Sequence, residues 1–243
     1  MRKQGKFEIH VAAPQMSYAE GLALFLQLED AGLQKNKYFL NVFNVPQDRD
    51  YDYVLDTPPT GHDLDAPYFM STAIVSSFEE AKALVRKGMA ILDAHNKAGN
   101  FEIERILAEQ TEDFLIDVEQ EFPEFQKIDD SPEYENHLIF RGTFQTLPSN
   151  QKIVRFIQKT MGVTMHQIVD FARTPLPDED TRISRIATIY QPSREAALTF
   201  SQSLRQVENT IGYSSIIAEQ VCLVGEAKQQ SQVESTPLLM TMG

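Results

Sequence analysis

The chain has 243 residues, enough for one large domain or two small ones, and 42% of them are hydrophobic and 23% charged. Its formal net charge of −13 argues against binding to nucleic acid without base-sequence specificity, because contacts to phosphates need a positive surface. The single cysteine, Cys222, excludes an internal disulfide framework and indicates a reducing compartment. No stretch approaches the roughly 18 uninterrupted apolar residues of a membrane span. We therefore expect a cytoplasmic protein with no membrane partner.

The first part of the chain shows strand and helix patterns in the order β-α-β-β-α-β. Residues 7–13 alternate apolar and polar side chains, which is typical of a half-buried strand. Ser17 and Ser77 each begin a Ser-x-x-Glu capping box, which predicts that a helix starts there. Gly32 and Gly99 mark the turns that follow these helices. The other three strands are predicted at residues 38–45, 68–75 and 101–107, with a polar loop at 46–67.

The same order of elements repeats in the second part of the chain. Ser149 and Ser193 cap the two helices, and Gly162 and Gly212 follow them. The four strands are predicted at residues 136–144, 166–172, 182–190 and 215–224. We divide the chain into a first unit (1–108), an acidic linker (109–134), a second unit (135–226) and a tail rich in Gln, Ser and Thr (227–243) that we expect to be disordered.

The repeated order predicts an α+β fold made of tandem ferredoxin-like βαββαβ units. A doubly wound parallel sheet is disfavoured because no helix separates the second and third strands of either half. The layout resembles the dimeric α+β barrel superfamily at the level of fold. This resemblance implies a pseudo-dimer of antiparallel sheets with the strand order 4-1-3-2 in each unit. The helices would cover the outer faces, and the bare sheet faces would be buried against each other.

A short motif occurs at the same place in both halves. The first strand of one half contains Glu8-Ile9-His10, and that of the other contains Glu135-Asn136-His137. Because side chains alternate along a strand, Glu8 and His10 share one face and the apolar neighbours share the other. The apolar residues should meet the helices. The Glu-x-His residues are therefore predicted to point towards the other half of the chain.

The fourth strands add carboxylates near these histidines. Glu102 and Glu104 alternate with apolar residues, and Glu219 occupies a comparable position in the second half. Strands one and four are neighbours in the predicted order. His10 can therefore lie beside Glu102 or Glu104, and His137 beside Glu219.

Histidines and carboxylates in a shared cavity admit two kinds of chemistry. Residues His10, Glu104, His137 and Glu219 could hold a divalent metal ion and leave positions open for a substrate. Alternatively, His10 and His137 could act in general acid–base catalysis with Glu8 and Glu135, since a carboxylate fixes the tautomer of its histidine. In either case the substrate would be a small polar molecule. Arginines that could bind an anionic ligand are Arg105, Arg141, Arg182 and Arg185.

A non-catalytic interpretation stays open beside these two. Polar residues that alternate on a strand are often a solvent-exposed face, and His–Glu pairs can simply stabilise an interface. The protein would then be a ligand-binding or protein-interaction module with structural histidines. The periodicity is also compatible with sheets that pack side by side, and with either a monomer or a homodimer.

Overall fold

The computed structural model describes residues 4–13, 18–33, 35–45, 69–97, 100–107, 121, 125–126, 134–174 and 177–227. Three of the sequence predictions lie outside these residues, namely the capping box at Ser17, the loop at 46–67 and the turn at Gly99, as do the tail beyond residue 227 and most of the linker. The first half contains β1 (Gln4–Ala13), α1 (Tyr18–Asp30), β2 (Lys35–Asn44), β3 (Phe69–Ser77), α3 (Phe78–Ala94) and β4 (Asn100–Ile106). After the short β5 (Phe125–Gln126), the second half contains β6 (Tyr134–Gly142), α5 (Asn150–Met161), β7 (Gln167–Ala172), β8 (Ile183–Gln191), α6 (Arg194–Gln206) and β9 (Ser215–Ala227).

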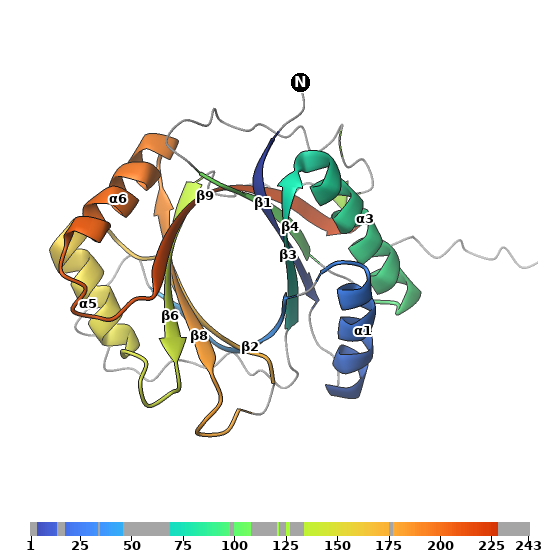
Figure 1. The fold of residues 1–243 in the computed structure, drawn as a ribbon, viewed down its shortest axis with the longest axis horizontal. Coiled ribbons are helices and arrows are strands. Elements are labelled where there is room, and N and C mark those ends of the chain that lie inside the picture. Colours follow the sequence, from blue (N-terminus) through green and yellow to red (C-terminus); the bar gives the residue numbers. More distant parts are fainter. Residues whose placement is uncertain are drawn as a thin grey trace, which may run out of the picture.

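The strands of both halves form one closed antiparallel barrel (Figure 1). Their order is β4-β1-β3-β2-β7-β8-β6-β9, and β9 pairs back onto β4 to close the ring. Each half therefore has the order 4-1-3-2, as expected for a ferredoxin-like unit. The predicted tandem duplication with outer helices is confirmed. The two sheets meet edge to edge at two seams, β2–β7 and β4–β9, so their inner faces enclose the barrel interior.

The helices cover the outside of the barrel, and each half has its own hydrophobic core beneath them (Figure 1). In the first half, Phe7, Ile9 and Val11 of β1 pack into a core with buried residues of α1 and α3. In the second half, Leu138 and Phe140 of β6 belong to the equivalent core under α5 and α6. Alternation along each strand thus sends one set of side chains outward to the helices and leaves the other set inside the barrel.

Serine caps and glycines set the helix ends where the sequence predicted them. The hydroxyls of Ser77, Ser149 and Ser193 each accept a hydrogen bond from the backbone N–H three residues later. Gly162 ends α5 with a φ of 66°, a left-handed conformation that a residue without Cβ adopts at little cost. These local signals fix where the chain reverses and hence which strands can pair.

The described residues of the linker contact both halves of the chain. Lys82 Nζ of α3 lies 2.8 Å from the Glu121 carboxylate, and Arg86 donates a hydrogen bond of 2.8 Å to the Glu121 carbonyl. Phe125 and Gln126 extend the sheet by pairing with the end of β9. This two-residue strand was not predicted, because no periodicity can be read from so short a segment. No described helix combines the length and the hydropathy that crossing a membrane requires.

Candidate metal centre

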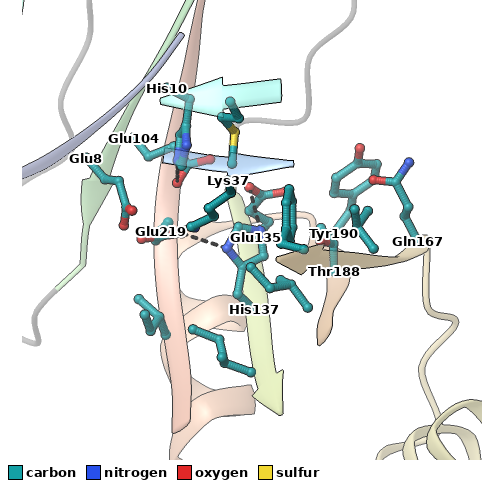
Figure 2. Close-up of a pocket in the computed structure, with 16 residues that line it drawn as sticks. Glu8, His10, Lys37, Glu104, Glu135, His137, Gln167, Thr188, Tyr190 and Glu219 are labelled. Atoms are coloured by element: carbon teal, nitrogen blue, oxygen red, sulfur yellow. Dashed lines mark hydrogen bonds and ion pairs between the residues drawn. The ribbon is translucent and has the colours of Figure 1, made fainter. Parts of the chain in front are cut away.

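The barrel interior contains a cavity of about 240 Å³ whose wall is acidic and imidazole-bearing in one region and apolar in another (Figure 2). Its carboxylate, imidazole and ammonium side chains come from Glu8, His10, Lys37, Glu104, Glu135, His137 and Glu219. Both Glu-x-His motifs therefore line one cavity, as their strand alternation predicted. Met70, Val169, Phe171 and Ile186 form an apolar cluster on the remaining wall.

Strand register places the same residue pairs in both halves. Glu8 lies directly opposite Glu104 across β1 and β4, and Glu135 lies directly opposite Glu219 across β6 and β9. The duplication therefore extends from the order of elements to a repeated pair of inward-facing glutamates.

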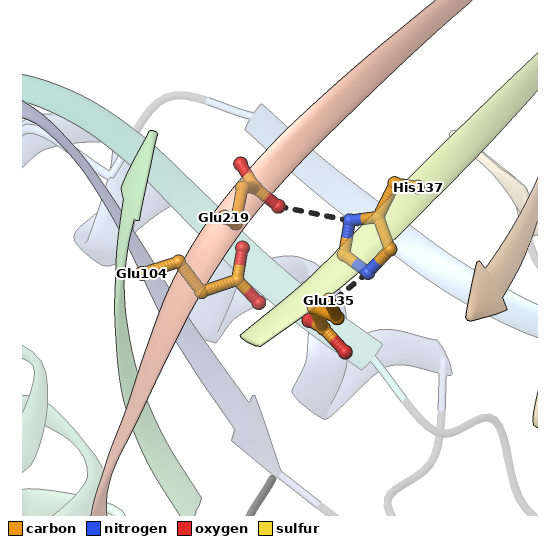
Figure 3. Close-up of side chains that lie close together, drawn as sticks. All are labelled: Glu104, Glu135, His137 and Glu219. Atoms are coloured by element: carbon orange, nitrogen blue, oxygen red, sulfur yellow. Dashed lines mark ion pairs between the residues drawn. The ribbon is translucent and has the colours of Figure 1, made fainter. Parts of the chain in front are cut away.

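His137 lies between two carboxylates. Its Nε2 is 3.1 Å from Glu135 Oε1, and its Nδ1 is 3.0 Å from Glu219 Oε2 (Figure 3). Burial disfavours the imidazolium and is the largest single effect on the pKa of His137. The charges and contacts of Glu135 and Glu219 together outweigh it and raise this pKa well above 6.5.

Glu219 is the most buried carboxylate of the group, with 1% of the residue exposed. Neither of its oxygens has an aligned hydrogen-bond donor, although Oε2 lies close to the His137 ring. Burial tends to raise the pKa of Glu219, but contacts with His137 and Glu104 and the charge of His10 lower it overall. A buried carboxylate without an aligned donor has oxygen lone pairs free to bind a cation.

Glu104 of β4 brings the first half into this group. Glu104, Glu135, His137 and Glu219 each offer one ligand atom, and these atoms all lie within 4.8 Å of one another (Figure 3). Three buried carboxylates against one imidazole leave an excess of negative charge in a space of low dielectric. Protons or a metal cation can compensate for that excess.

The four residues predicted as one metal set are divided between two groups. His10 does not join the group around His137 but belongs with Glu8 and Glu104 in a second group of ligand atoms within 4.8 Å. His10 Nε2 lies 3.0 Å from Glu104 Oε2, as expected from the neighbouring strands. The fourth residue of the group around His137 is Glu135, where His10 was predicted. The reason is that Glu135 is opposite Glu219 in the strand register, which the sequence does not reveal.

The predicted anion-binding arginines do not line the cavity in the part of the chain that the structure describes. Arg105 and Arg185 are in register with helix-facing residues, and Arg141 is exposed near the end of β6. Two guanidinium nitrogens of Arg185, Nε and Nη2, donate hydrogen bonds to the Asp170 carboxylate at 2.6 and 2.7 Å. Arg182 is also exposed, just before β8. The cation that does line the cavity is Lys37, which the sequence analysis did not single out.

Two inward-facing threonines were also missed. Thr72 lies opposite His10 across β1 and β3, and Thr188 lies opposite His137 across β6 and β8. Thr72 Oγ1 is 3.3 Å from His10 Nδ1. The two threonines occupy equivalent positions in the third strands of the two halves. Aligning the third strands, in the way that the Glu-x-His motifs align the first strands, could have revealed them.

Comparisons with known proteins provide no family. No family model matches the chain, and no curated protein matches it in sequence. Among solved structures, the chain is similar to a candidate glycine cleavage system transcriptional repressor (7% identity, 88% of this chain and 98% of that one, TM-score 0.26). It is also similar to a candidate monooxygenase from Fusobacterium nucleatum (7%, 94% and 96%, TM-score 0.26) and to a mutant chlorite dismutase from Candidatus Nitrospira defluvii (11%, 90% and 91%, TM-score 0.25). At TM-scores of this size, the fold assignment rests on the strand pairing described above.

Proposed function

We propose that this protein is a metal-dependent enzyme whose active site is the barrel cavity. The observation that supports this most strongly is Glu219, a fully buried carboxylate with no aligned donor, beside Glu104 and His137. Ligand atoms bound to one metal at about 2.1 Å lie about 3.0–3.4 Å apart. The separation of 3.0 Å between His137 Nδ1 and Glu219 Oε2 matches that spacing.

The proposed ligands are Glu104, Glu219 and Nδ1 of His137. Glu135, 3.1 Å from Nε2, would accept a hydrogen bond from the opposite side of the ring and fix its orientation. Three protein ligands leave coordination positions open, which is the arrangement of catalytic rather than structural sites. Two oxygens and one imidazole nitrogen suit Mn²⁺, Fe²⁺ or Zn²⁺.

The cavity wall indicates the kind of substrate. A bound ion would act as a Lewis acid towards an oxygen of the substrate, or would lower the pKa of a bound water. The apolar cluster of Met70, Val169, Phe171 and Ile186 would contact the hydrocarbon part of the same molecule. We therefore expect a small molecule with an oxygen-bearing end and an apolar body.

Metal analysis of protein purified without chelators tests the proposal. We expect bound metal in the purified protein and restored binding of Mn²⁺ or Zn²⁺ after chelation, measured by calorimetry. Glu219→Gln should weaken binding by about 100-fold or more, because loss of an outer-shell partner alone costs 10–100-fold. Glu29→Gln, an exposed glutamate on α1, is the matched control and should bind like the wild type. Absence of metal binding in the wild-type protein would contradict the proposal.

A metal-free acid–base enzyme is the second candidate, and one observation favours it. Thr72, His10 and Glu104 form a chain in which Nε2–H of the imidazole donates to the carboxylate and Nδ1 accepts from the threonine hydroxyl. This arrangement fixes the tautomer of His10 as a general acid–base group requires. If the wild type binds no metal, this pair becomes the leading candidate, and the non-catalytic alternative stands beside it.

A further inference from the structure

The first half of the chain repeats the ligand arrangement of the second half. Glu8 of β1 faces Glu104 of β4 in the same register in which Glu135 faces Glu219. His10 stands two residues after Glu8, as His137 stands two residues after Glu135. Glu8, His10 and Glu104 of the first half therefore correspond in position to Glu135, His137 and Glu219 of the second half.

The group in the first half has the geometry of a ligand set. One ligand atom each from Glu8, His10 and Glu104 lie within 4.8 Å of one another. His10 Nε2 and Glu104 Oε2 are 3.0 Å apart, which matches two ligands on one ion. Thr72 is fully buried on the other side of the ring, 3.3 Å from Nδ1, where its hydroxyl oxygen can accept from Nδ1–H when Nε2 binds a metal.

Glu104 belongs to both groups. It is one of the four residues around His137 and one of the three around His10. A carboxylate has two oxygens, so a single glutamate between two groups of ligands can bind one ion through each oxygen. Ions bridged in this way lie about 3.5–4 Å apart in two-metal enzymes.

The charge of the lining residues can accommodate a second divalent cation when an anionic group of a substrate is bound. Glu8, Glu104, Glu135 and Glu219 carry four negative charges when ionised, and Lys37 carries one positive charge. One divalent ion leaves a net charge of −1 with neutral imidazoles, and two divalent ions change it to +1, which one bound anionic group of a substrate would neutralise. The buried carboxylate of Glu219, which has no aligned hydrogen-bond donor although Oε2 lies 3.0 Å from His137 Nδ1, is the independent observation that points to a cation on this wall.

We propose that the barrel holds a dinuclear centre in which a second divalent ion is bound by Glu8, His10 and Glu104, and Glu104 bridges the two ions. This inference rests on the proposed function for the first ion, the one bound by His137 and Glu219. The pair of ions would hold both oxygens of a carboxylate or phosphate group of the substrate, with its apolar part against Phe171 and Met70.

Titration of the chelated full-length chain with Mn²⁺ tests the dinuclear centre. We expect two equivalents by calorimetry, and at two equivalents an electron paramagnetic resonance spectrum of exchange-coupled Mn²⁺ instead of isolated ions. His10→Ala should retain one equivalent with an uncoupled spectrum, and His137→Ala should also lose one. Thr72→Val, which keeps all ligands, should weaken the second ion by about 10–100-fold and leave the first unchanged.

The outcomes separate the two proposals. One equivalent in the wild type, unaffected by His10→Ala, overturns the dinuclear centre and leaves the mononuclear site standing. Two equivalents without magnetic coupling also overturn the bridging role of Glu104. No bound Mn²⁺ overturns the dinuclear Mn²⁺ centre, and no binding of either Mn²⁺ or Zn²⁺ overturns both proposals. Circular dichroism of each variant establishes that a lost ion reflects a lost ligand and not an unfolded barrel.

Discussion

Arg185 should behave as a structural residue, and Asp170→Asn tests this directly. The side chains of Arg185 and Asp170 are 11% and 3% exposed, and two short hydrogen bonds join them. Arg185 also donates a hydrogen bond of 2.5 Å to the Pro148 carbonyl, which ties the loop before α5 to β8. Neutralising Asp170 would leave a buried guanidinium without its counter-charge.

The expected cost follows from that burial. Removing one partner of a buried pair lowers the free energy of unfolding by about 3–5 kcal/mol. For a chain of this size, Tm falls by about 2–4 °C for each kcal/mol of lost stability. The expected fall in Tm is therefore roughly 6–20 °C. Urea denaturation of metal-free protein, followed by circular dichroism, measures the change.

Two controls sharpen this experiment. Arg182→Gln, at an exposed arginine just before β8, should change stability by less than about 0.5 kcal/mol. The double variant Asp170→Leu with Arg185→Met should recover much of the loss, because it leaves no buried charge unpaired. If Asp170→Asn costs less than about 1 kcal/mol, the pair does not stabilise the fold and the reasoning from its geometry fails.

Further predictions concern β6 and the histidines. Asn136 is fully buried and donates a hydrogen bond of 2.9 Å to the Ser201 hydroxyl, so Asn136→Ala should cost about 1–3 kcal/mol in urea denaturation; an unchanged midpoint would contradict this. In metal-free protein, NMR titration should find the pKa of His137 above 6.5, because Glu135 and Glu219 outweigh burial. Its contribution to stability should therefore be complete below about pH 6.5 and lost as the pH rises through the folded-state pKa; a contribution that grows with pH would refute the assignment. Burial, opposed by the charge of Glu135, should place the pKa of His166 below 6.5, and the same titration would contradict this if His166 stayed protonated above that pH.

The duplicated fold could be predicted because its signals are local. Ser77, Ser149 and Ser193 stand at the helix starts that their spacing indicated, and Gly162 stands at a helix end. The absence of a helix between the second and third strands favoured an antiparallel sheet. Closure into one barrel depends on β2 pairing with β7 and β4 with β9, and such pairings between distant segments leave no periodic trace in a sequence.

For the candidate site, strand alternation predicted which side chains face the interior but not which of them are neighbours across strands. Alternation placed His10 and His137 inside, and it could also have excluded Arg105, which shares its strand face with Phe101 and Ile103. Which carboxylate meets which histidine depends on strand register. For that reason the place of Glu135 beside His137 was not foreseen. Strand order alone placed His10 beside Glu102 or Glu104 and His137 beside Glu219.

The two seams also bear on how the chain folds during synthesis. Until the second half has been made, β2 and β4 of the first half are edge strands with unpaired backbone groups, which are prone to pair with other chains. The seam partner of β4 is β9, more than 100 residues further along, so the last barrel pairing joins segments of very large sequence separation. Loop closure over such distances slows folding. We therefore expect that a first half folded during synthesis is open to aggregation until the last described strand, β9, completes the ring.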